Sequence, residues 1–168
     1  LSAFFSGMEI AFVSANKMHI ELEKKKDTFL SRVLTKLTGN PSKFITTMLV
    51  GNNIALVVYG YFMGELLMPY LEPYLYNAFV ILLVQTLIST LIILVTAEFL
   101  PKAIFRVYSN ETLKIFAIPA YIFFLLFYFI SSFIMVISDF VLRIFFNTKE
   151  DDVQLAFTKA ELGDYINE

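Results

Sequence analysis

Long apolar segments constrain this chain more than any other feature of its sequence. A helix needs about 20 mostly apolar residues to cross a hydrocarbon core about 30 Å thick. Residues 44–68 and 76–100 meet that length, and residues 115–146 form a further long apolar stretch. Residues 1–14 are apolar but short, and we interpret them as a truncated first span. Hydrophobic residues make up 58% of the chain, above the roughly 45 to 50% of soluble domains, so the sequence predicts a membrane domain.

Basic residues orient these segments in the membrane. The stretch between the first two segments is rich in lysine and arginine, which by the positive-inside rule predicts a cytoplasmic location. Its basic residues are Lys17, Lys24, Lys25, Lys26, Arg32, Lys36 and Lys43. The next connection, residues 69–73, has none and is expected outside, whereas Lys102, Arg106 and Lys114 return the chain to the cytoplasm. The pattern predicts three spans with the N-terminus outside.

The fourth apolar segment, residues 115–146, leaves open whether the chain crosses the membrane three or four times. If it spans the membrane, the tail of residues 147–168 lies outside; if it re-enters or lies along the interface, the tail is cytoplasmic. Pro119 and the pair Ser131 and Ser132 are places where a helix could break. We favour the re-entrant or interfacial arrangement, which requires this segment to pack against the spans or a second subunit, because non-helical backbone at membrane depth must be buried in protein.

Four acidic residues lie within the apolar segments, where an ionised side chain costs roughly 2.5 to 3.5 kcal/mol at the helix centre. They are Glu9, Glu65, Glu98 and Asp139. Glu65 and Asp139 lie near the ends of their segments, and we favour a structural role for both. Each acid at membrane depth is a functional candidate by default, so Glu9 and Glu98 become the residues of interest.

Glu98 is followed three residues later by Pro101. Proline has no N–H, so the carbonyl of Ala97, four residues before it, loses its helical partner. A carboxylate beside a free carbonyl offers hard oxygen ligands of the kind that magnesium and calcium select. A helix end at the interface, with Glu98 beside Lys102, explains this segment equally well when it is considered alone.

The depth of other polar residues adds a second argument. At a rise of 1.5 Å per residue, counted from the nearest basic residues, Glu98 lies about 6 to 12 Å from the cytoplasmic boundary, Asn52 about 12 to 14 Å, and Ser6 and Glu9 about 12 to 17 Å. Ser6 and Glu9 are three residues apart and share one helical face. The three segments can therefore offer oxygens to one point. Such a set fits magnesium, and calcium or manganese would fit almost as well.

Several classes of function are excluded or disfavoured by the same sequence. Cysteine is absent and His19 is the single histidine, so a thiolate or multi-histidine metal site is excluded. The sequence contains no Ser/His/Asp set and no Gly-rich phosphate loop, which argues against an enzyme. It also carries no nucleic-acid footprint.

Three short motifs carry a resemblance to a known family. They are FSGMEIA at residues 5–11, GNNIA at residues 51–55 and AEFLPK at residues 97–102. In this order, and each within an apolar segment, they resemble the transmembrane domain of the CNNM/CorC family of magnesium transporters. The third motif usually begins Gly-Glu in that family, whereas here Ala97 precedes Glu98. Glu9 is shared by bacterial members, whereas animal members have a neutral residue there.

The resemblance implies a fold and a site. The expected fold is an all-α membrane protein with three transmembrane helices, a fourth re-entrant or interfacial segment and cytoplasmic juxtamembrane helices, forming a homodimer. The resemblance implies that Ser6, Asn52 and Glu98 hold a dehydrated magnesium ion. The Ala97 carbonyl is a further candidate ligand from the proline argument. The candidates for a supporting role around these ligands are Glu9, Asn53 and Pro101.

The resemblance also implies a domain organisation. Residues 1–146 form the transmembrane domain, and residues 147–168 are a cytoplasmic linker leading to an absent CBS-domain pair, which would bind adenine nucleotide. The expected function is magnesium transport or efflux by alternating access in the lipid of a bacterial inner membrane, with the C-terminus in the cytoplasm. The alternative is a membrane scaffold that anchors a cytosolic regulatory domain and holds a purely structural ion.

Overall fold

The computed structural model describes residues 1–146, and all the regular secondary structure in this range is helical. The chain divides into two compact units, Leu1–Tyr128 and Phe129–Glu168. The first unit contains seven α-helices and one π-helical segment. They are α1 (Ser2–Ser14), α2 (Lys17–Lys24), α3 (Phe29–Thr38), α4 (Pro41–Leu71), α5 (Ala78–Ile93), η1 (Leu94–Phe99), α6 (Leu100–Val107) and α7 (Ser109–Leu126). The expected linker, residues 147–168, lies outside the described residues.

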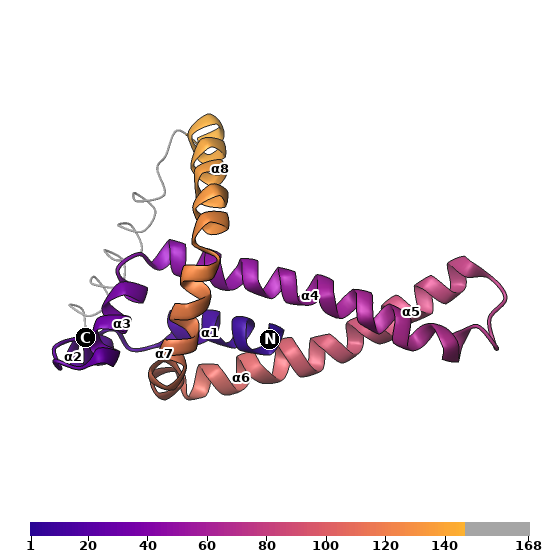
Figure 1. Cartoon of the computed structure of the whole chain (residues 1–168), viewed down its shortest axis with the longest axis horizontal. Coiled ribbons are helices and arrows are strands. Elements are labelled where there is room, and N and C mark those ends of the chain that lie inside the picture. The colour runs from indigo at the N-terminus through magenta and orange to yellow at the C-terminus, as the bar shows by residue number, and fades with distance from the viewer. Residues whose placement is uncertain (147–168) are drawn as a thin grey trace, which may run out of the picture. The chain divides into compact units, whose positions relative to one another are not determined.

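Two long helices form a hairpin in the first unit (Figure 1). The first is α4, with 31 residues, and the second is the continuous run Ala78–Val107, with 30 residues. Each has the length and apolar composition to cross a membrane, and at 1.5 Å per residue each is about 45 Å long. They match the spans expected at residues 44–68 and 76–100. The turn between them ends at Asn77, whose side chain accepts a hydrogen bond from the Phe79 amide and caps α5.

The short helix α1 packs at the centre of this unit, against α4, η1, α6 and α7 (Figure 1). Its buried residues include Phe5, Ser6, Gly7 and Met8. With 13 residues, α1 is shorter than the roughly 20 that a spanning helix requires. The structure thus confirms that this short apolar segment is helical, and its role as a truncated first span stays a prediction.

The helices α2 and α3 connect α1 to α4, and their ends are set by capping side chains. Asn16 caps α2, Thr28 caps α3 and Asn40 caps α4, in each case by accepting hydrogen bonds from amides of the first turn. Asparagine and threonine are favoured there because their oxygens satisfy amides that lack helical partners. On α3, Val33, Leu34 and Leu37 face the core and are buried. The apolar face of α3 therefore secures these short helices to the spans.

Glu23 on α2 is bound by lysines from two elements. Its Oε1 accepts hydrogen bonds from Lys114 of α7 at 2.6 Å and from Lys26 at 2.7 Å. These hydrogen bonds, with Lys114 contributing most, lower the pKa of Glu23 from 4.5 to about 2. The ion pairs thus link the connecting helices to the apolar helix α7.

We expect Glu23 to make stability depend on pH. A carboxyl whose pKa is lowered by folding stabilises the protein above its unfolded pKa and ceases to do so as pH falls through its folded pKa. The melting temperature of wild-type protein should therefore exceed that of Glu23→Gln at pH 6, and the gap should shrink between pH 4.5 and about 2. Glu21→Gln is the matched control, because Glu21 pairs with Lys24 and its side chain is 63% exposed. A difference in melting temperature that stays constant across this pH range would contradict the lowered pKa of Glu23.

The fourth apolar segment folds as two helices rather than one. After α7, the chain leaves helical geometry at Phe127, and α8 (Tyr128–Phe146) begins at the next residue. The break falls at neither position proposed from the sequence, since Pro119 lies inside α7 and Ser131 and Ser132 lie inside α8. Phe127 packs against the core cluster and stacks on Phe123, so tertiary packing rather than a helix-breaking residue accompanies the break.

The candidate spans of the described chain are α4, the run Ala78–Val107, and α7 with 18 residues. Two shorter apolar helices, Ser2–Ser14 and Tyr128–Leu142, accompany them. The described part of the second unit consists of α8 alone. The fold is therefore an all-α membrane protein with three candidate spanning helices, and re-entry of the fourth segment stays a prediction.

Candidate functional site: polar residues where α1 meets α4 and η1

Ser6 has an unusual environment on α1. Its side chain is fully buried, and its Oγ has no hydrogen-bond partner among the described residues. Leaving a buried hydroxyl without a partner costs about 1 to 3 kcal/mol, so each such group in a folded protein requires an explanation. Ser2 and Glu9 occupy the same face of α1, four residues before and three residues after Ser6. This face carries the polar side chains that α1 turns toward the other helices.

Asn52 on α4 lies against that face. Its side chain is 9% exposed, and its Oδ1 accepts a hydrogen bond of 2.6 Å from the Ser2 hydroxyl. Ser2 was not among the residues predicted from the sequence. Its spacing of four residues from Ser6, which places both on one helical face, was the available signal. The contact fixes Asn52 beside the polar face of α1.

Two motif glycines allow α1 to approach its neighbours closely. A Cβ atom at Gly51 of α4 would lie 2.6 Å from the ring of Phe5, and one at Gly7 of α1 would lie 2.5 Å from the ring of Phe105 on α6. Real side chains do not approach so closely, so any larger residue would force the rings to move. The glycines in FSGMEIA and GNNIA therefore position α1 between α4 and α6, next to the candidate ligands.

Glu98 lies on the π-helical segment η1, which contacts α1. Its side chain is 32% exposed, and its Oε2 lies 3.7 Å from Nζ of Lys102. The half-buried Glu9 is electrostatically coupled to both Glu98 and Lys102. Two carboxylates and one ammonium therefore gather where α1 meets the second long helix. This small cluster carries a net negative charge that a cation could neutralise.

The backbone at η1 departs from the α-helical pattern. The Leu100 amide donates to the Val95 carbonyl, five residues back, and such wide turns are frequent at functional sites. Pro101, which is buried, supplies no N–H to the carbonyls before it. The buried residue Ala97 is part of this segment. A free Ala97 carbonyl was predicted from the proline and stays a prediction, whereas the π-helical turn was not predicted from the sequence.

The remaining predicted residue, Asn53, has a different environment. Its side chain is exposed, next in sequence to the buried Asn52. The structure thus brings Asn52, Ser2, Glu9 and Glu98 to the surroundings of α1, and leaves Asn53 outside this packing. A supporting role for Asn53 stays a prediction.

A comparison with known protein families shows which family this chain belongs to. The family described as the cyclin M (CNNM) transmembrane N-terminal domain matches residues 1–168. This chain belongs to that family. A curated relative, the UPF0053 protein MG146 of Mycoplasma genitalium, is 26% identical over 132 residues, which are 76% of this chain and 30% of the relative. The cyclin M domain described here therefore spans about a third of the length of that relative, and it is an integral membrane domain.

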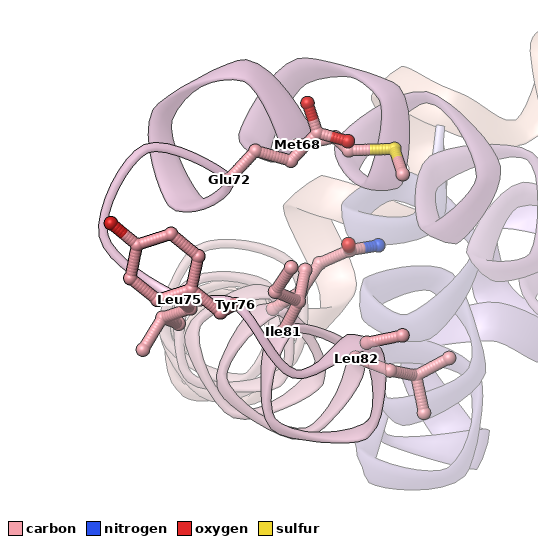
Figure 2. Close-up of a pocket in the computed structure, with 8 residues that line it drawn as sticks. Met68, Glu72, Leu75, Tyr76, Ile81 and Leu82 are labelled. Atoms are coloured by element: carbon pink, nitrogen blue, oxygen red, sulfur yellow. The ribbon is translucent and has the colours of Figure 1, made fainter.

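A cavity in this cyclin M domain lies elsewhere, at the connection between α4 and α5 (Figure 2). It measures about 540 Å³ and is lined by Met68, Glu72, Leu75, Tyr76, Ala78, Ile81, Leu82 and Gln85. None of the candidate site residues lines this cavity. A Cβ at Gly64 would lie 2.7 Å from the amide nitrogen of Gln85, so a larger residue there would displace the end of that side chain. The cavity does not mark the candidate site.

Proposed function

We propose that this domain binds a divalent cation, magnesium, between α1, α4 and η1 and carries it across the membrane. The observation that supports this proposal most strongly is the buried Ser6 hydroxyl, which has no hydrogen-bond partner within residues 1–146 and lies beside the helix that holds Asn52. A cation bound by Ser6, Asn52 and Glu98 would supply the missing interaction. Magnesium prefers oxygen ligands and is commonly held by one or two carboxylates together with neutral oxygens.

The electrostatics suggest how such a site would be filled. The Lys102 ammonium lies 3.7 Å from the Glu98 carboxylate. A divalent ion beside Glu98 and Glu9 would replace that weak attraction with a stronger one and repel the ammonium. Lys102 would then turn away as the ion enters, and return when the ion leaves. The Ala97 carbonyl would complete the shell, while Pro101 would shape the backbone at η1.

Alternating access is the transport mechanism that we propose. In transporters of this kind the ion site lies between helices near the middle of the membrane, and one group of helices moves relative to another. The exposed apolar faces of α4 and α5 would contact lipid and a second copy of the chain in a homodimer. Adenine nucleotide would act only through an additional cytosolic domain. We propose no catalytic chemistry for the transmembrane domain.

The test is ion flux through vesicles that contain only the purified protein. A magnesium-sensitive dye trapped inside the vesicles should report uptake that depends on protein and on the magnesium gradient. Magnesium binding should be measured on the same sample by calorimetry. Binding together with flux supports transport. Binding without flux would contradict transport and indicate a membrane scaffold with a structural ion, and absence of both would overturn the site itself.

A further inference from the structure

A second charged region is formed by the end of α2, the connection that follows it and α3. A cavity of about 470 Å³ is lined there almost entirely by polar side chains. They are Lys24, Lys25, Lys26, Asp27, Ser31, Arg32, Thr35 and Lys36. Five cationic groups therefore surround one carboxylate, and we name this set the basic cleft. Its excess positive charge predicts an anionic ligand.

The internal ion pairs of the basic cleft are weak or incomplete. Arg32 reaches Asp27 at 3.3 Å, but these side chains are 74% and 92% exposed, and exposed pairs of this kind contribute little. Lys25 is exposed as well. Its neighbours Lys24 and Lys26 pair with Glu21 and Glu23, which do not line the cavity. An anion in the cleft would therefore meet Lys25 and Arg32 at little cost in lost contacts.

Apolar side chains on the same two helices indicate that the anion belongs to a membrane. Met18 and Leu22 on α2 and Phe29 on α3 are 73%, 56% and 68% exposed. Short helices that combine exposed apolar residues with lysine and arginine lie in the interface of a bilayer. Polybasic segments next to a membrane helix are attracted to anionic lipids. A soluble anion would not require the apolar residues.

Lys36 of the basic cleft and Lys43, which does not line the cleft, each lie beside a tyrosine. Nζ of Lys36 lies 3.1 Å from the hydroxyl of Tyr121 and 5.5 Å from the centre of its ring. Nζ of Lys43, at the start of α4, lies 3.2 Å from the ring centre of Tyr128. Tyrosine is enriched where the hydrocarbon meets the headgroups. The contact of Lys36 therefore places the basic cleft beside Tyr121, a residue type that is common at the boundary between hydrocarbon and headgroups.

We propose that the basic cleft binds the phosphate of an anionic phospholipid headgroup in the adjacent leaflet. The lysine and arginine side chains would surround the phosphate, while Met18, Leu22 and Phe29 would contact the upper acyl chains. The bound lipid would hold α2 and α3 against the membrane. This inference is independent of the proposed ion transport, because none of the candidate ion ligands lines the cleft.

The test measures lipid retention by the purified protein in neutral detergent, using native mass spectrometry with dioleoyl phosphatidylglycerol and dioleoyl phosphatidylcholine. We expect one saturable phosphatidylglycerol adduct per chain and weak phosphatidylcholine binding. The double variant Lys25→Gln, Arg32→Gln should bind phosphatidylglycerol about 30-fold more weakly, which follows from about 1 kcal/mol for each basic residue. The matched control Lys17→Gln, Arg106→Gln removes the same charge outside the cleft and should change binding less than threefold.

Other outcomes would overturn the proposal. Equal losses in the cleft variant and the control variant would show that net charge alone attracts the lipid. Competition by inorganic phosphate or glycerol phosphate at the same concentration as the lipid would identify a site for a free anion. Circular dichroism of both variants checks that the helices are retained, and because the substituted side chains are exposed, folding is expected to be unaffected.

Discussion

Replacing Glu98 by glutamine should reduce magnesium flux at least 100-fold while leaving the protein folded. Glutamine has nearly the same shape but no charge, so the site would lose its carboxylate and the attraction for a divalent ion. Two unit charges 4 Å apart interact by about 4 kcal/mol at an effective dielectric constant of 20, and a divalent ion would lose about twice that. The expected loss therefore exceeds 100-fold even after allowance for the 32% exposure of this side chain.

The matched control is Glu65→Gln on α4. Glu65 is exposed and accepts a hydrogen bond from the Tyr61 hydroxyl at 2.7 Å, away from α1. Flux through this variant should stay within threefold of the wild type. Calorimetric titration with magnesium should show the same contrast, since the Glu98 variant loses binding and the Glu65 variant retains it. Equal flux in wild type and Glu98→Gln would contradict the role of Glu98 as a ligand.

The long helices were predictable from the sequence because hydropathy is a strong and local signal. Residues 44–68 and 76–100 fall within or close to α4 and Ala78–Val107. The ends were set by local chemistry as well, since Asn40 with Pro41 begins α4 and Asn77 begins α5. Side-chain caps and apolar length therefore determine most of the spanning architecture without any tertiary contact.

The break between α7 and α8 was not predictable in the same way. Proline and paired serines are the usual local signals, but Pro119 and Ser131 lie within helices. The chain instead breaks at Phe127, whose ring stacks on Phe123 and also approaches Phe5. Packing of aromatic rings from distant segments is invisible in a local pattern, and for that reason the break was misplaced.

The candidate ligands were proposed from the sequence, whereas the residues that surround them were not. Depth arguments brought Ser6, Asn52 and Glu98 together, whereas the hydrogen bond from Ser2 to Asn52 depends on the rotation of α1 against α4. The contact of Phe5 with Gly51 depends on the same rotation. A sequence gives the face of each helix but not the angle at which two faces meet.

The central claim is that Ser6, Asn52 and Glu98 point into one shared site, and paired cysteines test it directly. The chain contains no natural cysteine, so the introduced cysteines would supply every thiol that could bind a metal ion. Two thiolates that converge can bind one cadmium ion together, because thiolates favour soft cations. We expect the pairs Ser6→Cys, Asn52→Cys and Ser6→Cys, Glu98→Cys to bind cadmium at least 100-fold more tightly than each single variant.

The control pair is Ser6→Cys, Asn53→Cys, because the Asn53 side chain is exposed although it is adjacent to Asn52 in the sequence. Calorimetry with cadmium in detergent gives the affinity of each pair, and the control should bind no more tightly than its single variants. Tight binding by both site pairs, without tight binding by the control, is the result that this account predicts. Site pairs that bind cadmium no more tightly than single cysteines would show that the three side chains do not converge, and would contradict the account.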